Sequence, residues 1–207
     1  LEKKVGLVLE CCFDPVYGFG DTDTSRAALS EINKRLRERK IQKVITGCLN
    51  CYKLLSRYLE GIEVVFILDV LPAECFKNKW DGTAYLHHPC PSSRWENIMN
   101  SAQGVFRHLQ KSAEDVKANA PVFSAAPCCG NGGGLSSTSP ELADRFLERI
   151  VETSGENTLV TYCAGCQNRF LKRGIKAVHL LEGLSPKAPR EKVPSPPVQW
   201  ANRFLLA

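Results

Sequence analysis

Residues 158–166 read TLVTYCAGC, a short apolar run that leads directly into two cysteines separated by two residues. Residues 43–51 read KVITGCLNC and repeat this arrangement, with Cys48 and Cys163 at the same position in the two stretches. Each apolar run has the length and the β-branched content of a buried strand. Cysteines with this spacing at the start of a helix can direct two sulfurs at one metal centre. We therefore predict a strand and then a helix in both places, with sulfur at the junction.

The other cysteines extend the repeat. Cys11 and Cys12 are adjacent, as are Cys128 and Cys129 in the second half of the chain. Core packing does not require cysteine at matching offsets, whereas thiolates around a soft metal must converge from distant segments. We predict nine of the ten cysteines to be metal or cluster ligands: Cys11, Cys12, Cys48, Cys51, Cys90, Cys128, Cys129, Cys163 and Cys166.

Composition restricts the class of protein. The chain has 207 residues, of which 43% are hydrophobic and 24% are charged, as in an ordinary globular protein. No apolar run approaches the roughly 20 residues that span a bilayer, and the start Leu1-Glu2-Lys3-Lys4 lacks the pattern of a signal peptide. A chain of this length can bury a core without disulfides, so reduced thiolates are favoured. We expect a cytoplasmic protein, with any peripheral contact with a membrane made through a partner.

The net charge argues against a nucleic-acid partner. The formal charge is +5, and each 4Fe–4S core with four thiolates carries about −2. Two such clusters would bring the protein to about +1. No basic run is interleaved with aromatic residues, which is the usual pattern of a nucleic-acid surface.

Strands and helices are predicted to alternate along the chain. In the first half we expect a helix at 24–40, with Asp23 or Thr24 as its N-cap, and a helix that runs from Cys48 to Gly61. In the second half we expect helices that start at Ser139-Pro140-Glu141 and at Cys163, and one that follows a capping box at Ser93-x-x-Glu96. The predicted strands are 4–10, 41–46, 63–68, 83–88, 121–126, 158–162 and 175–180.

This alternation predicts an α/β fold with two pseudo-symmetric halves, each a small, mostly parallel sheet flanked by helices. We predict the divisions 1–78 for the first half, 79–184 for the second half and 185–207 for a proline-rich tail. Sites in parallel sheets form at the carboxyl ends of strands. The cysteine groups follow predicted strands, so we expect the sulfurs at one edge of each sheet.

The second cysteine set resembles a known family. The pattern Cys90-x37-Cys128-Cys129-Gly130-x32-Cys163-x-x-Cys166 resembles the CCG motif of the heterodisulfide reductase B/D family. Similar domains occur in iron–sulfur subunits of glycolate, lactate and anaerobic glycerol-3-phosphate oxidation systems. The resemblance covers about residues 4–184 as a tandem pair. It implies an iron–sulfur redox unit in which two cysteine sets hold noncubane clusters and a disulfide is reduced between them.

The resemblance also implies ligand sets. One cluster would take Cys90, Cys128, Cys129, Cys163 and Cys166, and the other would take Cys11, Cys12, Cys48 and Cys51. The first half departs from the motif, because no cysteine precedes Cys11 and Phe13 stands where the motif has glycine. Four thiolates suffice for a cubane 4Fe–4S cluster or for zinc. We expect a 4Fe–4S cluster of noncubane form at the second site, and either a 4Fe–4S cluster or zinc at the first.

Together these observations predict an iron–sulfur oxidoreductase subunit that works between a flavin or ferredoxin-like partner and a small disulfide or thiol. One alternative is an electron-transfer subunit of an organic-acid dehydrogenase that feeds quinone. Another is a non-catalytic interaction module stabilised by zinc. Simple thiol–disulfide exchange at the paired cysteines would leave the other cysteines without a role. His88 is the candidate catalytic residue, as a proton source, and Cys75 is expected to be a buried free thiol.

Overall fold

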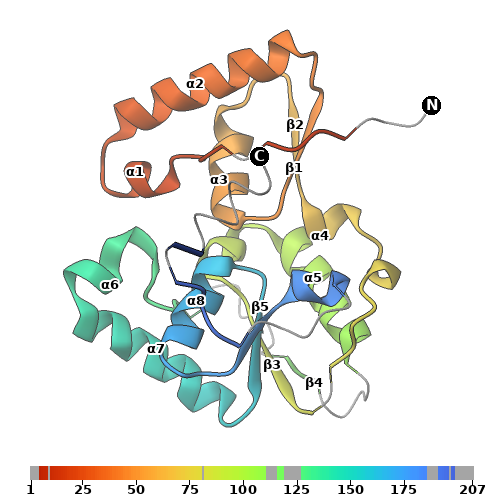
Figure 1. Ribbon diagram of the computed structural model, residues 1–207, viewed down its shortest axis with the longest axis vertical. Helices are drawn as coiled ribbons and strands as arrows, with labels where there is room; N and C mark the ends of the chain where they lie inside the picture. Colours follow the sequence, from red (N-terminus) through yellow and green to blue (C-terminus); the bar gives the residue numbers. More distant parts are fainter. Residues whose placement is uncertain are drawn as a thin grey trace.

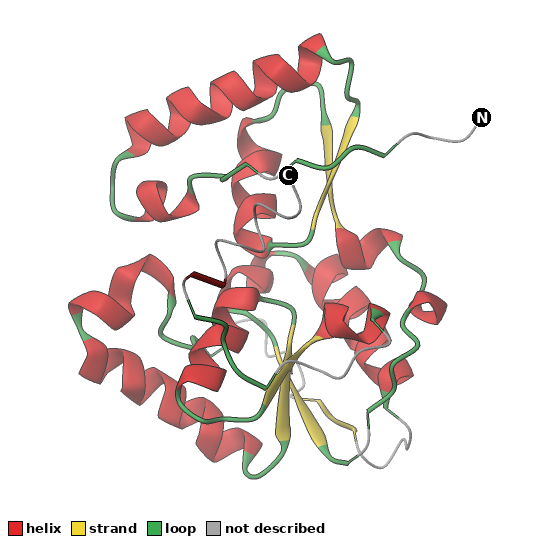
Figure 2. Cartoon of the chain, in the orientation of Figure 1, coloured by secondary structure: helices red, strands yellow, loops and turns green. Residues whose placement is uncertain are grey.

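The computed structural model describes residues 5–8, 10–80, 82–110, 116–118, 127–185, 191–195 and 197–198. These residues form two lobes, each with a parallel sheet and helices packed around it (Figure 1, Figure 2). The first half of the chain makes one lobe and the second half makes the other. The predicted α/β class with two halves and small parallel sheets is confirmed.

The first lobe is built on two strands. β1 (Lys43–Thr46) pairs in parallel with β2 (Glu63–Phe66), and α3 (Leu49–Tyr58) makes the crossover between them. α1 (Asp14–Gly18) and α2 (Thr22–Glu38) precede the sheet. Each of the longer helices buries one apolar stripe, with Leu29 and Ile32 on α2 and Leu49 and Leu54 on α3.

The second lobe repeats this order around a larger sheet. Its four parallel strands lie in the order β4-β3-β5-β6, with bounds Val116–Ala118, Ala84–His87, Thr158–Thr161 and Ala177–His179 respectively. Its α-helices are α5 (Glu96–Leu109), α6 (Leu135–Thr138), α7 (Pro140–Ser154) and α8 (Ala164–Lys172). The succession α2–β1–α3–β2 of the first lobe thus recurs as α7–β5–α8–β6. The helix start at Ser139-Pro140 lies where the sequence predicts it.

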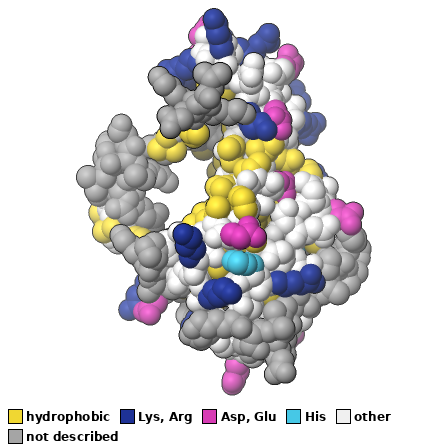
Figure 3. Space-filling model, turned by 90° about the vertical axis from the view of Figure 1, so that its right-hand side faces the viewer, with side chains coloured by type: hydrophobic (Ala, Val, Ile, Leu, Met, Phe, Trp, Pro, Cys, Tyr) yellow, Lys and Arg dark blue, Asp and Glu magenta, His cyan; other side chains and the backbone are white. Residues whose placement is uncertain are grey.

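The two lobes share one hydrophobic core. Phe66 at the end of β2 is 1% exposed, and its ring packs edge-on against Tyr162 at a centroid distance of 6.3 Å. α4 (Ile67–Val70) follows at once and packs on α5, where Asp69 accepts hydrogen bonds from Asn97 and Ser101. Figure 3 shows apolar side chains gathered midway along one face of the molecule. The division of the chain at residues 78 and 184 stays a prediction, and most of the tail lies outside the described residues.

The strand predicted at 4–10 is wrong for residues 5–8 and 10, which have no strand structure. In the second lobe, β4 is the last described strand before Cys128 and pairs with β3. The described part of the first lobe contains no counterpart of β3. The backbone of this segment therefore has no neighbouring strand, and Val5 and Leu7 are 88% and 71% exposed. The strand predicted at 121–126 lies outside the described residues.

Several predicted boundaries are also wrong. The capping box does not form: Ser93 lies in a 3₁₀ turn, η2 (Cys90–Arg94), where its hydroxyl donates to the Cys90 carbonyl, and α5 starts after Trp95. α3 ends at Tyr58 rather than at Gly61. β2 stops at Phe66 because the next four residues turn into α4 and bury Leu68 against the shared core.

The N-cap of α2 is Asp21 and not Asp23 or Thr24, and it gives a first testable prediction. Hydrogen bonds from the hydroxyl and the backbone N–H of Thr24 lower the pKa of Asp21. We expect Asp21→Ala to lower Tm by about 3 °C at pH 7. The difference in Tm between Asp21→Ala and the wild type should vanish as the pH falls through the lowered pKa of Asp21. Protonation of Asp21 then removes the charged acceptor in the folded wild-type protein.

Ser139→Ala is the matched control for this cap. Ser139 is the N-cap of α7, but its side chain makes no capping hydrogen bond. Its replacement should change Tm by less than about 1 °C. Equal shifts in the two variants, measured by circular dichroism, would show that the Asp21 bond does not stabilise α2.

Candidate metal centre

Four of the predicted ligand cysteines lie where a strand meets a helix. Cys48 follows β1 and is the N-cap of α3, and Cys163 follows β5 and is the N-cap of α8. Their backbones match closely, with φ, ψ of −129°, 127° and −130°, 117°. Cys51 and Cys166 lie one turn further, inside the two helices. The carboxyl ends of the strands therefore hold the sulfurs at one edge of each sheet, as expected for a site in a parallel sheet.

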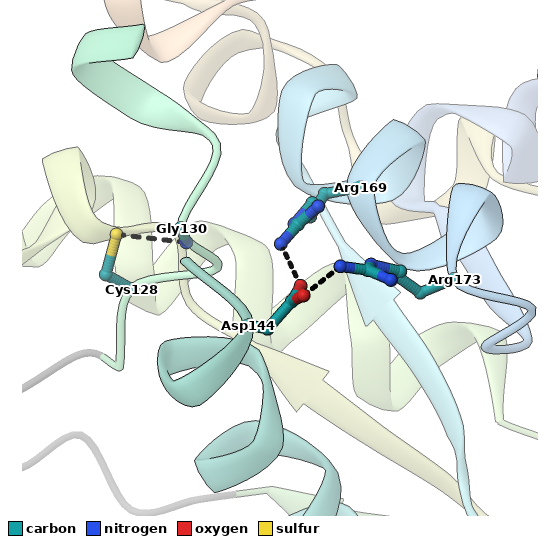
Figure 4. Close-up of polar contacts among 5 residues, drawn as sticks. All are labelled: Cys128, Gly130, Asp144, Arg169 and Arg173. Carbon is teal, nitrogen blue, oxygen red and sulfur yellow. Dashed lines mark hydrogen bonds and ion pairs between the residues drawn. The ribbon is translucent and has the colours of Figure 1, made fainter. Parts of the chain in front are cut away.

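The two adjacent-cysteine loops also share one backbone conformation. In the first lobe, the N–H of Phe13 donates to the Cys11 sulfur at 3.3 Å, and Phe13 has φ of 60°. In the second lobe, the N–H of Gly130 donates to the Cys128 sulfur at 3.3 Å, and Gly130 has φ of 75° (Figure 4). Phe13 thus adopts the left-handed conformation that glycine reaches without strain. The sequence difference at this position changes the residue type but not the turn.

At the second site, five cysteines from different elements lie close together. Cys90 is in hydrogen-bonding contact with Cys128, and Cys166 is in contact with both Cys129 and Cys163. The hydrogen bond from Cys90 lowers the pKa of Cys128 to about 6, and the N–H of Gly130 adds to this effect against the cost of burial. The pKa of Cys90 rises, chiefly because its thiol donates that hydrogen bond. The site therefore favours thiolate at Cys128, as a metal ligand requires.

At the first site, three of the four cysteines meet. The Cys51 thiol donates to Cys12 and Cys48. Its hydrogen bond lowers the pKa of Cys48 to about 6 and also lowers the pKa of Cys12. Cys11 is exposed, in contrast to the partly buried Cys128 of the second lobe. The first set is thus smaller and more open than the second.

The two cysteine sets lie next to each other across the junction of the lobes. The hydrogen bond from Cys166 lowers the pKa of Cys163, while the charge of Cys48 in the other lobe opposes that shift. The glycine turn η4 (Gly132–Gly134) contacts α1, and Gly134 leaves room for the ring of Phe19. The loops after Cys12 and Cys129 therefore touch. The fold brings together all the predicted cysteines except that Cys11 faces solvent.

Two buried histidines lie where β3 ends: His87 is its last residue and His88 follows it. They face opposite sides of the sheet, as the alternation of strand residues predicts. His87 is 1% exposed, packs on Phe170 at 5.2 Å, and has its pKa lowered to about 3 by burial. The Nδ1 of His88 lies 2.8 Å from the hydroxyl oxygen of Tyr162, and burial lowers the pKa of His88 to about 4. Sequence reasoning missed Tyr162, although its place directly before Cys163 at the end of a buried strand was a usable signal.

This geometry agrees with a comparison with protein families. Residues 84–170, which include all five cysteines of the second site, match the model of the CCG cysteine-rich domain. This part of the chain is thus similar to a CCG cysteine-rich domain. The match begins at β3 and ends in α8, so it contains the strand, the glycine turn and the helix that position the sulfurs.

One of three related curated proteins is named as an iron-sulfur protein, one as a subunit of a reductase and one for lactate utilization. An uncharacterized iron-sulfur protein of Methanococcus maripaludis is 25% identical over 164 residues, which are 76% of this chain and 32% of that protein. One subunit of the dihydromethanophenazine:CoB–CoM heterodisulfide reductase of Methanosarcina barkeri is 25% identical over 183 residues, 80% of this chain and 43% of that protein. Lactate utilization protein A of a Geobacillus strain is 23% identical over 205 residues, 86% of this chain and 83% of that protein. The chain thus spans less than half of the first two relatives.

The arrangement of sulfurs fits a cluster better than a single ion. In the described ranges, no three His, Cys, Asp or Glu side chains converge closely enough to hold one metal ion. Zinc with Zn–S bonds of about 2.3 Å requires its four sulfurs within about 4 Å of one another. An iron–sulfur cluster spreads its thiolate ligands over several metal atoms. Cysteines that meet in pairs at the carboxyl ends of the strands are therefore compatible with an iron–sulfur cluster.

Ion pairs brace the helices that flank the CCG site. Asp144 on α7 accepts from Arg169 on α8 and from Arg173 directly after it, and Arg169 is 8% exposed (Figure 4). α8 also carries Cys166, so this contact fixes that sulfur relative to α7. At the same end of α7, Gly130 approaches the backbone of Ala143 so closely that a Cβ would lie 2.5 Å from the carbonyl oxygen. Both contacts restrict movement of the ligand segments.

Cys75 and a cavity lie outside the site. The prediction that Cys75 is buried is wrong: it ends the turn η1 (Ala73–Cys75), which directs the next residue, Phe76, into the core and leaves Cys75 exposed. A cavity of about 700 Å³ lies at the amino ends of the second-lobe strands, beside Trp80 and Lys176. No cysteine lines this cavity, which is at the opposite edge of the sheet from the CCG site.

Among the described helices, none has the length and apolar character needed to cross a bilayer.

Proposed function

We propose that this chain is an iron–sulfur redox subunit that transfers electrons between a partner subunit and a disulfide or thiol substrate. The observation that carries this proposal is the meeting of two cysteine sets at the junction of the lobes. A site that only stabilised the fold would not need a second, neighbouring thiolate set. A pair of neighbouring redox groups suits a substrate that must accept two electrons, as a disulfide does.

The second site would hold its cluster with Cys90, Cys128, Cys129, Cys163 and Cys166. The first site would use Cys11, Cys12, Cys48 and Cys51. When bound, clusters of the 4Fe–4S type supply one-electron transfer. Five thiolates exceed the four of a cubane, which supports a noncubane form at the second site, whereas four suit a cubane at the first. The chain itself holds thiolate charge with the N–H groups of Phe13 and Gly130 and excludes water with its shared core.

The relatives support a partner subunit for this chain. The relative from Methanosarcina barkeri is named as one subunit of a reductase. A further relative from Methanothermobacter marburgensis, 25% identical over 197 residues, is named as one subunit of a fumarate reductase (CoM/CoB). We propose a flavin or ferredoxin-like partner that exchanges electrons with the first or second site. Ten free cysteines suit the reducing cytoplasm, where such thiolates persist.

A second candidate is electron transfer from an organic-acid dehydrogenase to quinone. It is favoured by the Geobacillus relative, which is named for lactate utilization and of which this chain covers 83%. In that case the substrate would be oxidised on another subunit, and this chain would carry electrons without binding a thiol.

The two candidates differ in what the reduced protein reacts with. The iron-loaded protein is reduced without oxygen, a small disulfide is added, and the cluster is followed by electron paramagnetic resonance. We expect the disulfide to change the spectrum and to reoxidise the protein. A spectrum that no disulfide or thiol alters, together with rapid reoxidation by a quinone analogue, would favour the second candidate. A colourless protein without iron after anaerobic purification would contradict both and leave the zinc-stabilised module.

A further inference from the structure

The cavity at the amino ends of the second-lobe strands has the form of a small-molecule site. Its volume is about 700 Å³, which lies within the range of ligand pockets in proteins. Ala84, Thr158 and Ala177 are the first residues of β3, β5 and β6, and all three line it. Leu171 near the end of α8 and Ile175 just after it add apolar surface. The apolar part of a ligand can therefore be buried here, at the edge of the sheet that the cysteines do not use.

The charged residues around this cavity are mostly basic. Among the described residues that line it are Lys79, Lys176 and Lys192, against the single carboxylate of Glu191. The three lysines come from separate segments of the chain, so the fold brings them together and no local run of charge does. In the part of the chain that the structure describes, no carboxylate forms an ion pair with any of them. Lysines that meet without counter-ions attract an anion.

Trp80 brings an unused hydrogen-bond donor to the same cavity. It is one of the lining residues, and its backbone N–H donates to the Leu109 carbonyl oxygen at 2.9 Å, which ties this segment to the end of α5. The indole Nε1 of Trp80 is buried and has no hydrogen-bond partner among the described residues. An indole N–H only donates, and a buried donor without an acceptor is unfavourable. A ligand that carries an acceptor oxygen would supply the missing partner.

We propose that this cavity binds a small organic anion with an apolar body and one acidic group. The body lies against the amino ends of the strands, and the acidic group lies among the lysines, where one oxygen accepts from the Nε1 of Trp80. A purely apolar compound would leave the lysines and the indole N–H without a partner, and inorganic phosphate would leave the apolar surface in water. No described cysteine takes part, so binding at this cavity is independent of the proposed redox function.

Two fluorescent probes that differ in one acidic group test this site on the whole chain as purified. The anion is 1-anilinonaphthalene-8-sulfonate, and the neutral probe is N-phenyl-1-naphthylamine, which is the same aromatic body without the sulfonate. Equilibrium dialysis gives the dissociation constant of each. The double variant Lys79→Gln/Lys176→Gln removes two charges from the lining. Its matched control is Lys77→Gln/Lys172→Gln, because these exposed lysines lie two and four positions from the first pair and do not line the cavity.

We expect Lys79→Gln/Lys176→Gln to bind the sulfonate about fivefold to tenfold more weakly than the wild type and the neutral probe equally well. The control pair should keep both dissociation constants within about twofold of the wild type. Trp80→Phe keeps an aromatic ring and removes the indole N–H, so it should weaken sulfonate binding about threefold. Equal losses in the two double variants, or equal affinity of the wild type for the two probes, would overturn the inference. Unchanged sulfonate binding in Trp80→Phe would exclude the contact with Nε1.

Discussion

Replacing Cys128 with alanine is expected to remove about half or more of the iron that this protein binds. Cys128 contacts Cys90, accepts the N–H of Gly130, and has its pKa lowered to about 6 by the hydrogen bond from Cys90. Its loss removes the sulfur that this turn holds in place. Cys11→Ala should remove less iron, because Cys11 is exposed and belongs to the smaller set. Iron per chain, measured after anaerobic loading, gives the comparison.

Cys75→Ala is the control for this experiment. Cys75 is exposed and lies outside the cysteine repeat, so its replacement should leave the iron content unchanged. A larger iron loss in Cys11→Ala than in Cys128→Ala would reverse the ranking of the two sites. Equal losses in all three variants would show that the loss reflects handling of the protein rather than a ligand.

Gly130→Ala is expected to destabilise the fold by about 3 kcal/mol. A Cβ at this position would lie 2.5 Å from the Ala143 carbonyl oxygen and 2.9 Å from its Cα, at a backbone φ of +75°. The start of α7 and the cysteine loop cannot both keep their places, because the contact is with backbone rather than with a flexible side chain. Urea unfolding of the iron-free protein measures the change.

Gly132→Ala is the matched control two residues away. Nothing lies within 4 Å of the Cβ position at Gly132, and its φ is not positive. We expect its unfolding free energy to stay within about 1 kcal/mol of the wild type. If the free energy of unfolding falls by a similar amount in the two variants, the loop can move to accommodate a side chain at position 130. Its close approach to α7 is then not needed for stability.

The sequence predicts where the cysteines lie better than it predicts which residues hold them in place. The apolar runs before Cys48 and Cys163 are strands, and both cysteines cap helices, because a local pattern determines each junction. The contact between His88 and Tyr162 joins residues 74 positions apart, and no local pattern specifies it. The left-handed turn at Phe13 is equally hidden, since residue type argues against it, whereas its N–H donates to Cys11 and its carbonyl accepts from the N–H of Tyr17. The ligand assignments themselves stay predictions.

Other predictions are wrong because the structure of a segment depends on the elements that lie next to it. Residues 5–8 have the composition of a strand, but a strand forms only beside a partner. Cys75 has the burial tendency of free cysteine, but the 3₁₀ turn before Phe76 turns it outward. In both cases the tertiary surroundings outweigh the local preference.

Among the described residues, no strand lies beside the second edge of β1, where β3 lies beside β5 in the second lobe. In the described part of the first lobe, β1 pairs with β2 alone, and Ile45 on β1 is 49% exposed. The unpaired N–H and C=O groups of such an edge form a template for a further strand from another polypeptide. Self-association by edge-to-edge pairing is therefore a hazard for this chain at high concentration, and a bound segment that completed the first sheet would suppress it.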